Sequence, residues 1–299
     1  MLLLGGCERK APVPPADSLA PVAISAADRH SPALDRSGWI RAAGPALFIQ
    51  GASMQEAIAV YPFPEDTIDQ ERLDSMGTEG TAVALFGRGG TRLVAQLGVL
   101  PDQAETSCER WVLRDVRPAG GVAASAWSVG FADARVAPMV LDSIEALSPR
   151  DSAALAAEAS RLASGVTAPT GDSFQGLRFA AHDVRRFEAA PGIQAIVAHL
   201  KRQVNQEANP QQEQTLIIAE RDSGATTGPY QLAYAERSFG REEEVITLEV
   251  LAGARFGAGS QPTLVIARDG DAGVRYAFVE REARRRWRAR WTSAPAKCG

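Results

Sequence analysis

Two histidines in the C-terminal half are the side chains best placed to begin a metal site. His182 and His199 belong to neighbouring expected strands, one on each side of a turn signal. A turn centred on Ala190-Pro191 places the two imidazoles opposite each other, whereas a turn at Pro191-Gly192 makes them diagonal neighbours. In either case the spacing predicts that the two rings lie close together.

Imidazole nitrogens bind zinc, and Asp183 or Glu188 could supply further ligands to such an ion. However, no repeated ligand spacing surrounds the two histidines, and ordinary surface or half-buried strand residues explain them as well. The sequence therefore leaves His182 and His199 as weak metal candidates, and we expect no metal or other cofactor.

An arginine-rich segment near the C-terminus carries the densest local charge. Because alternate strand residues project to opposite faces, one face would hold Arg284, Arg286, Arg288 and Arg290. Trp287, Ala289 and Trp291 would share the other face. The arginine face could contact anionic lipid head groups or an acidic partner. Alternatively, it is a solvated face balanced by acidic neighbours. These neighbours are Glu242, Glu243, Glu244, Glu280 and Glu282.

Two glycine-rich runs are similar to parts of ligand-binding loops. The run from Arg268 to Gly273 resembles part of a calcium loop but lacks the later bidentate carboxylate. The run from Gly87 to Gly90 has no Walker-type lysine pattern and no following helix. Both runs therefore predict hairpin turns, in which glycine supplies the positive φ.

Linear catalytic motifs are absent from the sequence. It contains no G-x-S-x-G, H-E-x-x-H, C-x-x-C or dinucleotide G-x-G-x-x-G pattern. The third histidine, His30, lies in the N-terminal tether described below. Paired carboxylates leave no linear motif, so a carboxylate-based enzyme stays open.

The N-terminal run Leu4-Gly5-Gly6-Cys7 combines an aliphatic residue, two small residues and a cysteine. It resembles the lipobox of bacterial lipoproteins. In that class a signal peptidase cleaves before the cysteine, whose thiol receives a diacylglyceryl group. The resemblance implies that Cys7 is the acylated first residue of the mature protein.

A tether-like stretch follows, from Glu8 to about Arg36, and it is rich in proline and small residues. Such composition favours extended, solvated chain that holds a domain away from a bilayer. A complete secretory signal also has a basic region and about 7–15 apolar residues, of which only Leu2 to Leu4 are present. Either translation begins upstream of Met1 or the likeness is accidental.

Cys108 and Cys298 are the remaining two of three cysteines if Cys7 is lipidated. In an oxidising compartment such a pair favours a disulfide. Closing so long a loop would stabilise the fold by on the order of 4 kcal/mol in the chain-entropy model. Two free thiols are the alternative.

The elements that carry these residues form a globular, mainly β chain. The 299 residues are 45% hydrophobic and 23% charged, with a net charge of −4. This composition supports a sizeable core and argues against nucleic-acid binding through overall charge. No apolar run approaches the roughly 20 residues of a membrane-spanning helix.

Short apolar runs separated by turn residues predict an antiparallel meander of hairpins in a mainly β, α+β fold. The expected strands are 46–50, 81–86, 91–97, 111–113, 123–131, 177–187, 193–204, 215–220, 230–236, 245–251, 263–267, 274–280 and 286–291. One helix is expected over about 149–164, because Ser148 can cap it and Pro149 suits its first position. The run 215–219 is similar to 263–267, which indicates either a repeated hairpin or chance.

Three segments are expected along the chain. Residues 1–37 form the signal end and tether, residues 38–166 a β-rich subdomain with the helix, and residues 174–299 an antiparallel β subdomain. Together these features predict a lipid-anchored cell-envelope protein, periplasmic or surface-exposed, with a binding or structural role. Its partners would be the membrane, through the N-terminal lipid, and an unknown envelope protein or ligand. The alternatives are an envelope hydrolase with a carboxylate-based site and a cytoplasmic β-rich protein whose lipobox is accidental.

Overall fold

The computed structural model describes nine stretches of the chain. They are residues 38–62, 80–99, 107–119, 126–132, 135–166, 174–204, 210–224, 228–257 and 261–298. Cys7, His30 and the expected tether lie outside these stretches. The chain described is mainly β with antiparallel sheets and one α-helix, which confirms the expected fold class.

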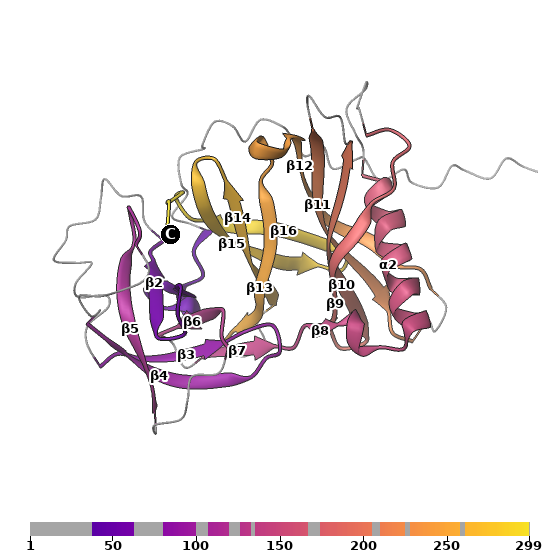
Figure 1. Cartoon of the computed structure of the whole chain (residues 1–299). Helices are drawn as coiled ribbons and strands as arrows, with labels where there is room; N and C mark the ends of the chain where they lie inside the picture. Colours follow the sequence, from indigo (N-terminus) through magenta and orange to yellow (C-terminus); the bar gives the residue numbers. More distant parts are fainter. Residues whose placement is uncertain are drawn as a thin grey trace, which may run out of the picture.

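The N-terminal part closes into a six-stranded barrel (Figure 1). Its strands are β1 (Leu47–Gln50), β2 (Glu56–Val60), β3 (Ala82–Phe86), β4 (Arg92–Gly98), β5 (Val112–Pro118) and β6 (Val129–Phe131). They follow the order β1-β2-β5-β4-β3-β6, and a short 3-10 helix, η3 (Arg41–Ala43), precedes them.

Two five-stranded sheets follow the barrel, and we name them by position. The outer sheet has the order β12-β11-β10-β9-β8 and the middle sheet the order β16-β15-β14-β13-β7. The outer strands are β8 (Asp142–Ser143), β9 (Ala180–Ala190), β10 (Ile193–Val204), β11 (Gln211–Asp222) and β12 (Gln231–Arg241). The middle strands are β7 (Val136–Met139), β13 (Thr247–Phe256), β14 (Pro262–Gly270), β15 (Gly273–Ala283) and β16 (Arg286–Thr292). Two short 3-10 helices, η6 (Ile144–Ala146) and η7 (Glu242–Glu244), complete the elements.

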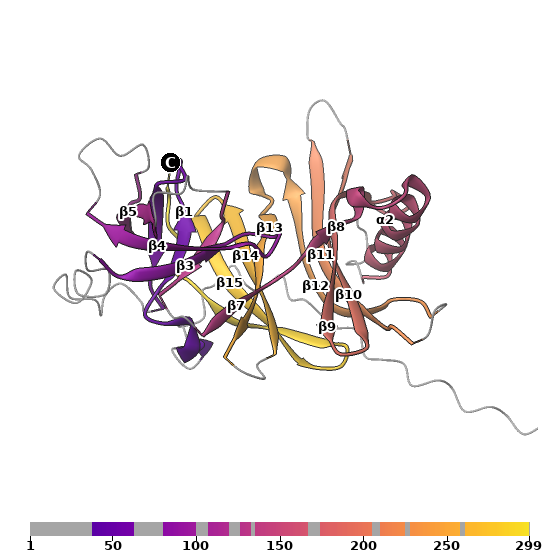
Figure 2. The same cartoon turned by 90° about the horizontal axis from the view of Figure 1, so that it is seen from below.

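The layers stack in the order barrel, middle sheet, outer sheet and helix α2 (Pro149–Ser164), as Figures 1 and 2 show. Strand β14 explains why the middle sheet lies inside. Its residues from Pro262 to Ala267 are all buried. Leu264 and Ile266 pack against the outer sheet, whereas Val265 and Ala267 pack against the barrel. A strand buried on both faces reads as a continuous apolar run, which is what this segment contains.

Helix α2 begins and ends as its sequence predicts. Its N-cap Ser148 accepts a hydrogen bond from the backbone N–H of Asp151 at 3.2 Å, and Pro149 occupies the first helical position. The Ser148 hydroxyl also donates to the Asp151 carboxylate at 2.7 Å. Ala159 and Leu162 are buried against the outer sheet. The cap and the narrow apolar stripe thus place the helix on one face of that sheet.

The two glycine-rich runs form the expected turns. Gly270 pairs with Gly273 across a two-residue loop, and Gly273 has φ +100°. A Cβ at Gly273 would also lie 2.4 Å from the Ala296 carbonyl oxygen, so glycine is required there on two grounds. The run from Gly87 to Gly90 links β3 to β4, with Gly90 at φ +73°.

The sheets do not follow the expected division at 166–174. Strands β7 and β8 and helix α2 precede that point in the chain, yet β7 pairs with β13, β8 pairs with β9, and α2 packs on the outer sheet. The segment from β7 to β8 therefore supplies an edge to both sheets in succession (Figure 2).

Of the helices in the described stretches, none has the length and apolar character needed to cross a bilayer.

Candidate functional site

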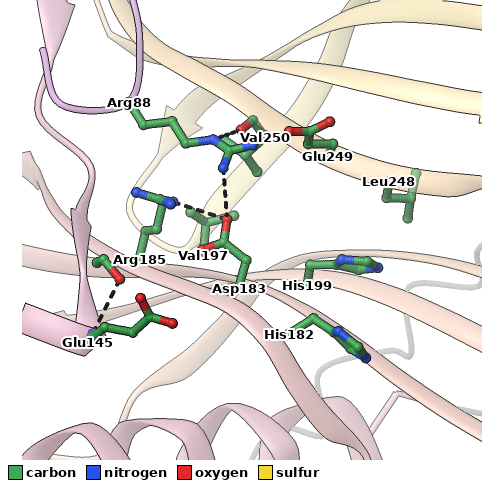
Figure 3. Close-up of a pocket in the computed structure, with 11 residues that line it drawn as sticks. Arg88, Glu145, His182, Asp183, Arg185, Val197, His199, Leu248, Glu249 and Val250 are labelled. Atoms are coloured by element: carbon green, nitrogen blue, oxygen red, sulfur yellow. Dashed lines mark hydrogen bonds and ion pairs between the residues drawn. The ribbon is translucent and has the colours of Figure 1, made fainter. Parts of the chain in front are cut away.

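A cavity of about 340 Å³ opens where the barrel meets both sheets (Figure 3). The β3–β4 turn contributes to its wall, together with β9 and β10 of the outer sheet and β13 of the middle sheet. Val197, Leu248 and Val250 supply apolar surface. The ionisable side chains that line it are Arg88, Glu145, His182, Asp183, Arg185, His199 and Glu249.

A β-bulge brings the two histidines together. His199 pairs with Asp183, and the next residue of β10, Leu200, pairs with Ala181, so His182 is the extra residue of β9. In a regular strand His182 and Asp183 would face opposite sides, whereas a bulge re-aims one side chain. As a result His182, Asp183 and His199 all line the cavity, and the two imidazole centroids lie 5.9 Å apart. The predicted proximity is confirmed, with the Pro191-Gly192 turn between the strands.

The half-buried His199 is held by a hydrogen bond on the β11 side. Its Nε2 lies 2.9 Å from Oε1 of Gln214, whose Nε2 donates to Thr247 Oγ1 at 3.4 Å. Burial lowers the pKa of His199 below its usual value, and the nearby His182 acts in the same direction. The bond to Gln214 and the charges of Asp183 and Glu249 oppose this shift without overcoming it. His199 is therefore a neutral imidazole at neutral pH.

Arg88, at the tip of the β3–β4 turn, joins the barrel to both sheets. Its Nε donates to the Val250 carbonyl oxygen at 2.5 Å, and its Nη2 contacts the Glu249 carboxylate. Its Nη1 lies 3.7 Å from Asp183 Oδ2. The Arg88 carbonyl in turn accepts from the N–H of Leu141 at 2.8 Å. Through Arg88, the β3–β4 turn of the barrel thus contacts both the middle sheet and the outer sheet.

Asp183 is shared between two arginines. Arg185 Nε donates to Asp183 Oδ2 at 3.0 Å, and Arg185 Nη1 donates to the Leu141 carbonyl at 3.2 Å. Of the three carboxylates at the cavity, Asp183 and Glu249 are thus held by guanidinium groups. Glu188, the other expected ligand, is exposed and is not part of the cavity lining.

Two almost fully buried carboxylates lie outside the cavity and pair with arginines. Glu213 binds Arg202 and Arg237, both at 2.6–2.7 Å. Glu220 accepts from Arg281 at 2.7 Å and from Trp287 Nε1 at 2.7 Å. Burial raises the pKa of Glu220, but these bonds and one from the Arg285 N–H outweigh it, so the pKa lies below its usual value. Because Arg281 and Trp287 belong to the middle sheet, Glu220 fastens the outer sheet to it.

A second cavity, of about 460 Å³, lies beside the β14–β15 hairpin. It is lined in part by Asp269 and Asp271 of the calcium-loop-like run, with Tyr276 and Gln50. Burial, followed by the charge of Asp269, raises the pKa of Tyr276. In the stretches that the structure describes, no set of three or more His, Cys, Asp and Glu side chains is arranged to hold a metal ion.

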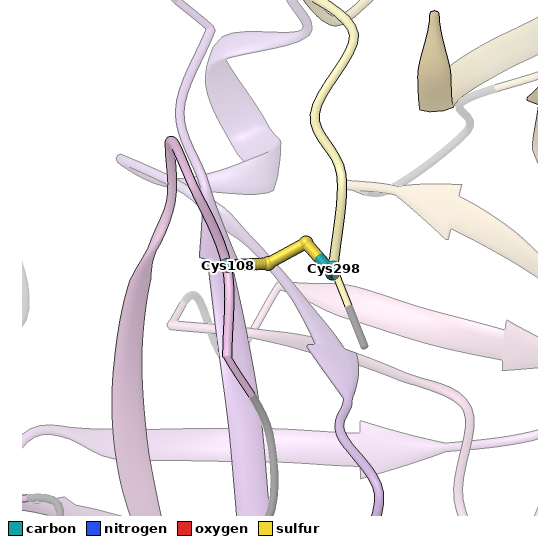
Figure 4. The surroundings of a disulfide bond; sticks show 2 residues. All are labelled: Cys108 and Cys298. Carbon is teal, nitrogen blue, oxygen red and sulfur yellow. A yellow bond between two sulfur atoms is a disulfide. The ribbon is translucent and has the colours of Figure 1, made fainter. Parts of the chain in front are cut away.

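Cys108 and Cys298 form a disulfide (Figure 4). Their Cα atoms lie 4.2 Å apart although 190 positions separate them in sequence. The two residues also form an isolated antiparallel bridge, and the Glu109 N–H donates to the Lys297 carbonyl at 3.0 Å. The bond ties the barrel to the chain segment that follows the middle sheet.

The arginine-rich segment departs from the expected single strand. Arg284 lies in the β15–β16 turn, where it contacts Asp222. Arg290 is the extra residue of a bulge, because Phe278 pairs with Trp291 and Val279 with Ala289. This bulge moves Trp291 to the barrel side, while Trp287 packs between the two sheets. The expectation that both tryptophans share a face is therefore wrong.

Acidic partners stand beside each of these arginines. Arg286 and Arg288 pair with Glu282 at 3.1 Å and 2.9 Å, and Arg290 pairs with Glu280 at 3.2 Å. The segment therefore matches the alternative expectation, in which acidic neighbours balance the charges of a solvated arginine face.

Sequence reasoning missed most of the cavity. Arg88 is expected only as a turn residue, and nothing in its glycine-rich run indicates that its side chain is half-buried between the layers. Arg185, Glu145, Gln214 and Glu249 carry no motif, because their shared location depends on the packing of separate layers.

Comparison with known proteins adds no relative: no family model, no curated protein and no solved structure matches this chain.

Proposed function

We propose that this chain is a lipid-anchored protein of the bacterial cell envelope and that its role is to bind rather than to catalyse. The anchor is Cys7, and the folded part stands off the membrane on the tether that follows it. The binding site is the cavity between the barrel and the two sheets.

The disulfide is the observation that best supports the proposed location in the cell envelope. Disulfides persist in oxidising compartments and are rare in the cytosol. The chain has three cysteines, and Cys108 and Cys298 are joined to each other. Cys7 is the one outside that bond, which is the thiol that the lipobox resemblance marks for acylation. Cysteine pairing and the N-terminal pattern thus agree.

The cavity supports a binding role through the way its charges are held. Arg88 and Arg185 have fixed partners, and two of the carboxylates are engaged by them. Side chains fixed in this way favour recognition of a small polar ligand, because little side-chain freedom is lost on binding. Apolar surface from Val197, Leu248 and Val250 would bury the remainder of such a ligand.

An envelope hydrolase is the second candidate, and one observation favours it. Glu145, Asp183 and Glu249 converge on the same cavity as His199. Among these carboxylates Glu145 is the one without an arginine partner in the stretches that the structure describes, so it would be the acid–base group. Hydrolysis of ester, phosphoester or glycoside substrates that Glu145→Gln abolishes would favour the enzyme over the binding protein.

Metabolic labelling tests the anchor. The gene, with its natural upstream sequence, is expressed in bacteria supplied with radioactive palmitate, with and without the signal-peptidase inhibitor globomycin. We expect a labelled membrane-bound protein whose processing globomycin blocks and whose label is lost in Cys7→Ser.

The matched control is Cys108→Ser, which removes a different thiol and should keep the label. A wild-type protein without label, or label that persists in Cys7→Ser, would refute the anchor.

A further inference from the structure

We propose that His182 and His199 form a binding site for a divalent transition-metal ion of the Zn²⁺, Ni²⁺ or Cu²⁺ type. The two imidazoles supply two ligands, and water or a donor atom of a bound molecule supplies the others. This site goes beyond the proposed anchor and does not depend on it.

The bulge in β9 is the first observation in favour. It adds one residue to the strand at His182 and turns that side chain to the face that His199 occupies. Bulges of this kind often occur next to functional sites, where they re-aim a side chain. In the register set by the His199–Asp183 pair, an unbulged strand would turn His182 to the opposite face, so the bulge places it on the same face as His199.

The hydrogen bonds of His199 are the second observation. Gln214 donates from its Nε2 to Thr247, so its Oε1 is the atom that faces His199. The imidazole must then carry its proton on Nε2 in order to donate, and Nδ1 keeps the lone pair. A ligand histidine that gives its other N–H to a carbonyl oxygen is the usual arrangement around protein-bound metals.

The geometry of the two rings is the third observation. Metal–nitrogen bonds of about 2.0–2.1 Å place two imidazoles on one ion with centroids roughly 5–6 Å apart. The His182 and His199 centroids are 5.9 Å apart. Since β9 and β11 flank β10 on opposite sides, the bond to Gln214 does not occupy the side of the ring that faces His182.

The surroundings fix the class of ion. Imidazole nitrogens suit zinc, copper and nickel, whereas magnesium and calcium prefer sets of oxygen ligands. The nearest carboxylate in the ladder, Asp183, is held by Arg185. With two protein ligands the coordination shell stays open, as it does in sites where a metal binds a further molecule. A metal at this place would therefore add a contact for a ligand of the cavity.

Calorimetric titration of the purified, untagged full chain with ZnCl₂, NiCl₂ and CuSO₄ tests the site. We expect one ion per chain, with Cu²⁺ bound more tightly than Ni²⁺ or Zn²⁺. His182→Ala and His199→Ala should each weaken binding by at least about tenfold, and Gln214→Leu by about tenfold through loss of ring orientation. His30→Ala is the matched control, because it removes the only other histidine of the chain and should change nothing.

A structural role for the histidines gives a different result. His182 is exposed, so His182→Ala should keep the circular dichroism spectrum and melting temperature of the wild type while it loses metal. Electron paramagnetic resonance of the Cu²⁺ form should show coupling to two imidazole nitrogens in the wild type and to one in either variant. Absence of binding to the wild type, or equal binding by His182→Ala, would overturn the proposal.

Discussion

At the scale of single residues, a buried carboxylate contributes more to the stability of this fold than a carboxylate near the surface. Glu220 is 1% exposed and receives hydrogen bonds from Arg281, Trp287 and the N–H of Arg285. Glu282 pairs with Arg286 and Arg288 nearer the surface. Removing one partner of a buried ion pair leaves the other charge without compensation, whereas water compensates at a surface pair.

We therefore expect Glu220→Gln to lower the free energy of unfolding at pH 7 by about 3 kcal/mol. Glu282→Gln, the matched surface control, should cost less than about 1 kcal/mol. Urea denaturation followed by tryptophan fluorescence measures both. Equal effects in the two variants would show that Glu220 is not the stronger link.

Acid should remove the advantage of Glu220. Its pKa in the folded state lies below the value of about 4.3 of an unfolded chain, so its contribution is complete above that value. The contribution is lost as the pH falls through the lowered folded pKa. The stability difference between wild type and Glu220→Gln should thus be largest near neutral pH and shrink below about pH 4. A difference that grows on acidification would contradict the direction of the shift.

At the residue scale the alternation of side chains was predictable and the bulges were not. The pattern from Arg286 to Arg288 correctly predicts an exposed, a buried and an exposed residue. The bulges at His182 and Arg290 shift the pairing by one position, and neither residue type marks such a shift. The histidine pair could be predicted to be close, but not the face on which it lies.

At the element scale, local signals explain which elements the sequence predicts. Helix α2 has a capping serine, an N-terminal proline and an apolar stripe, so its bounds follow from local chemistry. Strand β2 is buried at every position and has no alternation to detect. Strand β7 contains Pro138, which argues against a strand, yet a proline is tolerated because β7 is the edge of the middle sheet.

The cap of α2 gives a prediction at this scale. Ser148→Ala removes the acceptor for the Asp151 N–H and should lower the free energy of unfolding by about 1 kcal/mol. Ser148→Thr keeps both the acceptor for the Asp151 N–H and the donor for its carboxylate, and should retain most of the stability. Thermal denaturation followed by circular dichroism compares the three proteins. Equal losses in both variants would show that the cap contributes nothing.

At the scale of the whole molecule, the disulfide closes the largest loop. Replacing both cysteines, Cys108→Ser with Cys298→Ser, should lower the free energy of unfolding by about 4 kcal/mol. Cys7→Ser is the control and should leave it unchanged, because Cys7 is outside the bond. Urea denaturation without reductant measures the difference. Addition of reductant should bring the wild type to the level of the double variant, and an unchanged stability would contradict a structural role for the bond.

The order of the layers could not be read from the sequence. Hairpins such as β14–β15 pair strands that are adjacent in the sequence, and their turn residues make them predictable. The pairing of β7 with β13 joins Met139 to Gly253, and nothing local links these residues. The cavity exists only after such distant segments meet, which is why its members were predicted singly or not at all.

The position of the middle sheet has a consequence for the order in which the chain acquires its structure. The barrel strands are synthesised first, but the apolar surface that they turn toward Val265 and Phe278 stays uncovered until β13 to β16 have emerged. During that interval this apolar face is exposed to water, and Cys298, the disulfide partner of Cys108, has not yet been synthesised. The barrel core is therefore complete only after the C-terminal strands have been synthesised, and the Cys108–Cys298 bond forms after them. The C-terminal strands thus cover the apolar face of the barrel, and Cys298, which follows them, is bonded to Cys108 of the barrel part.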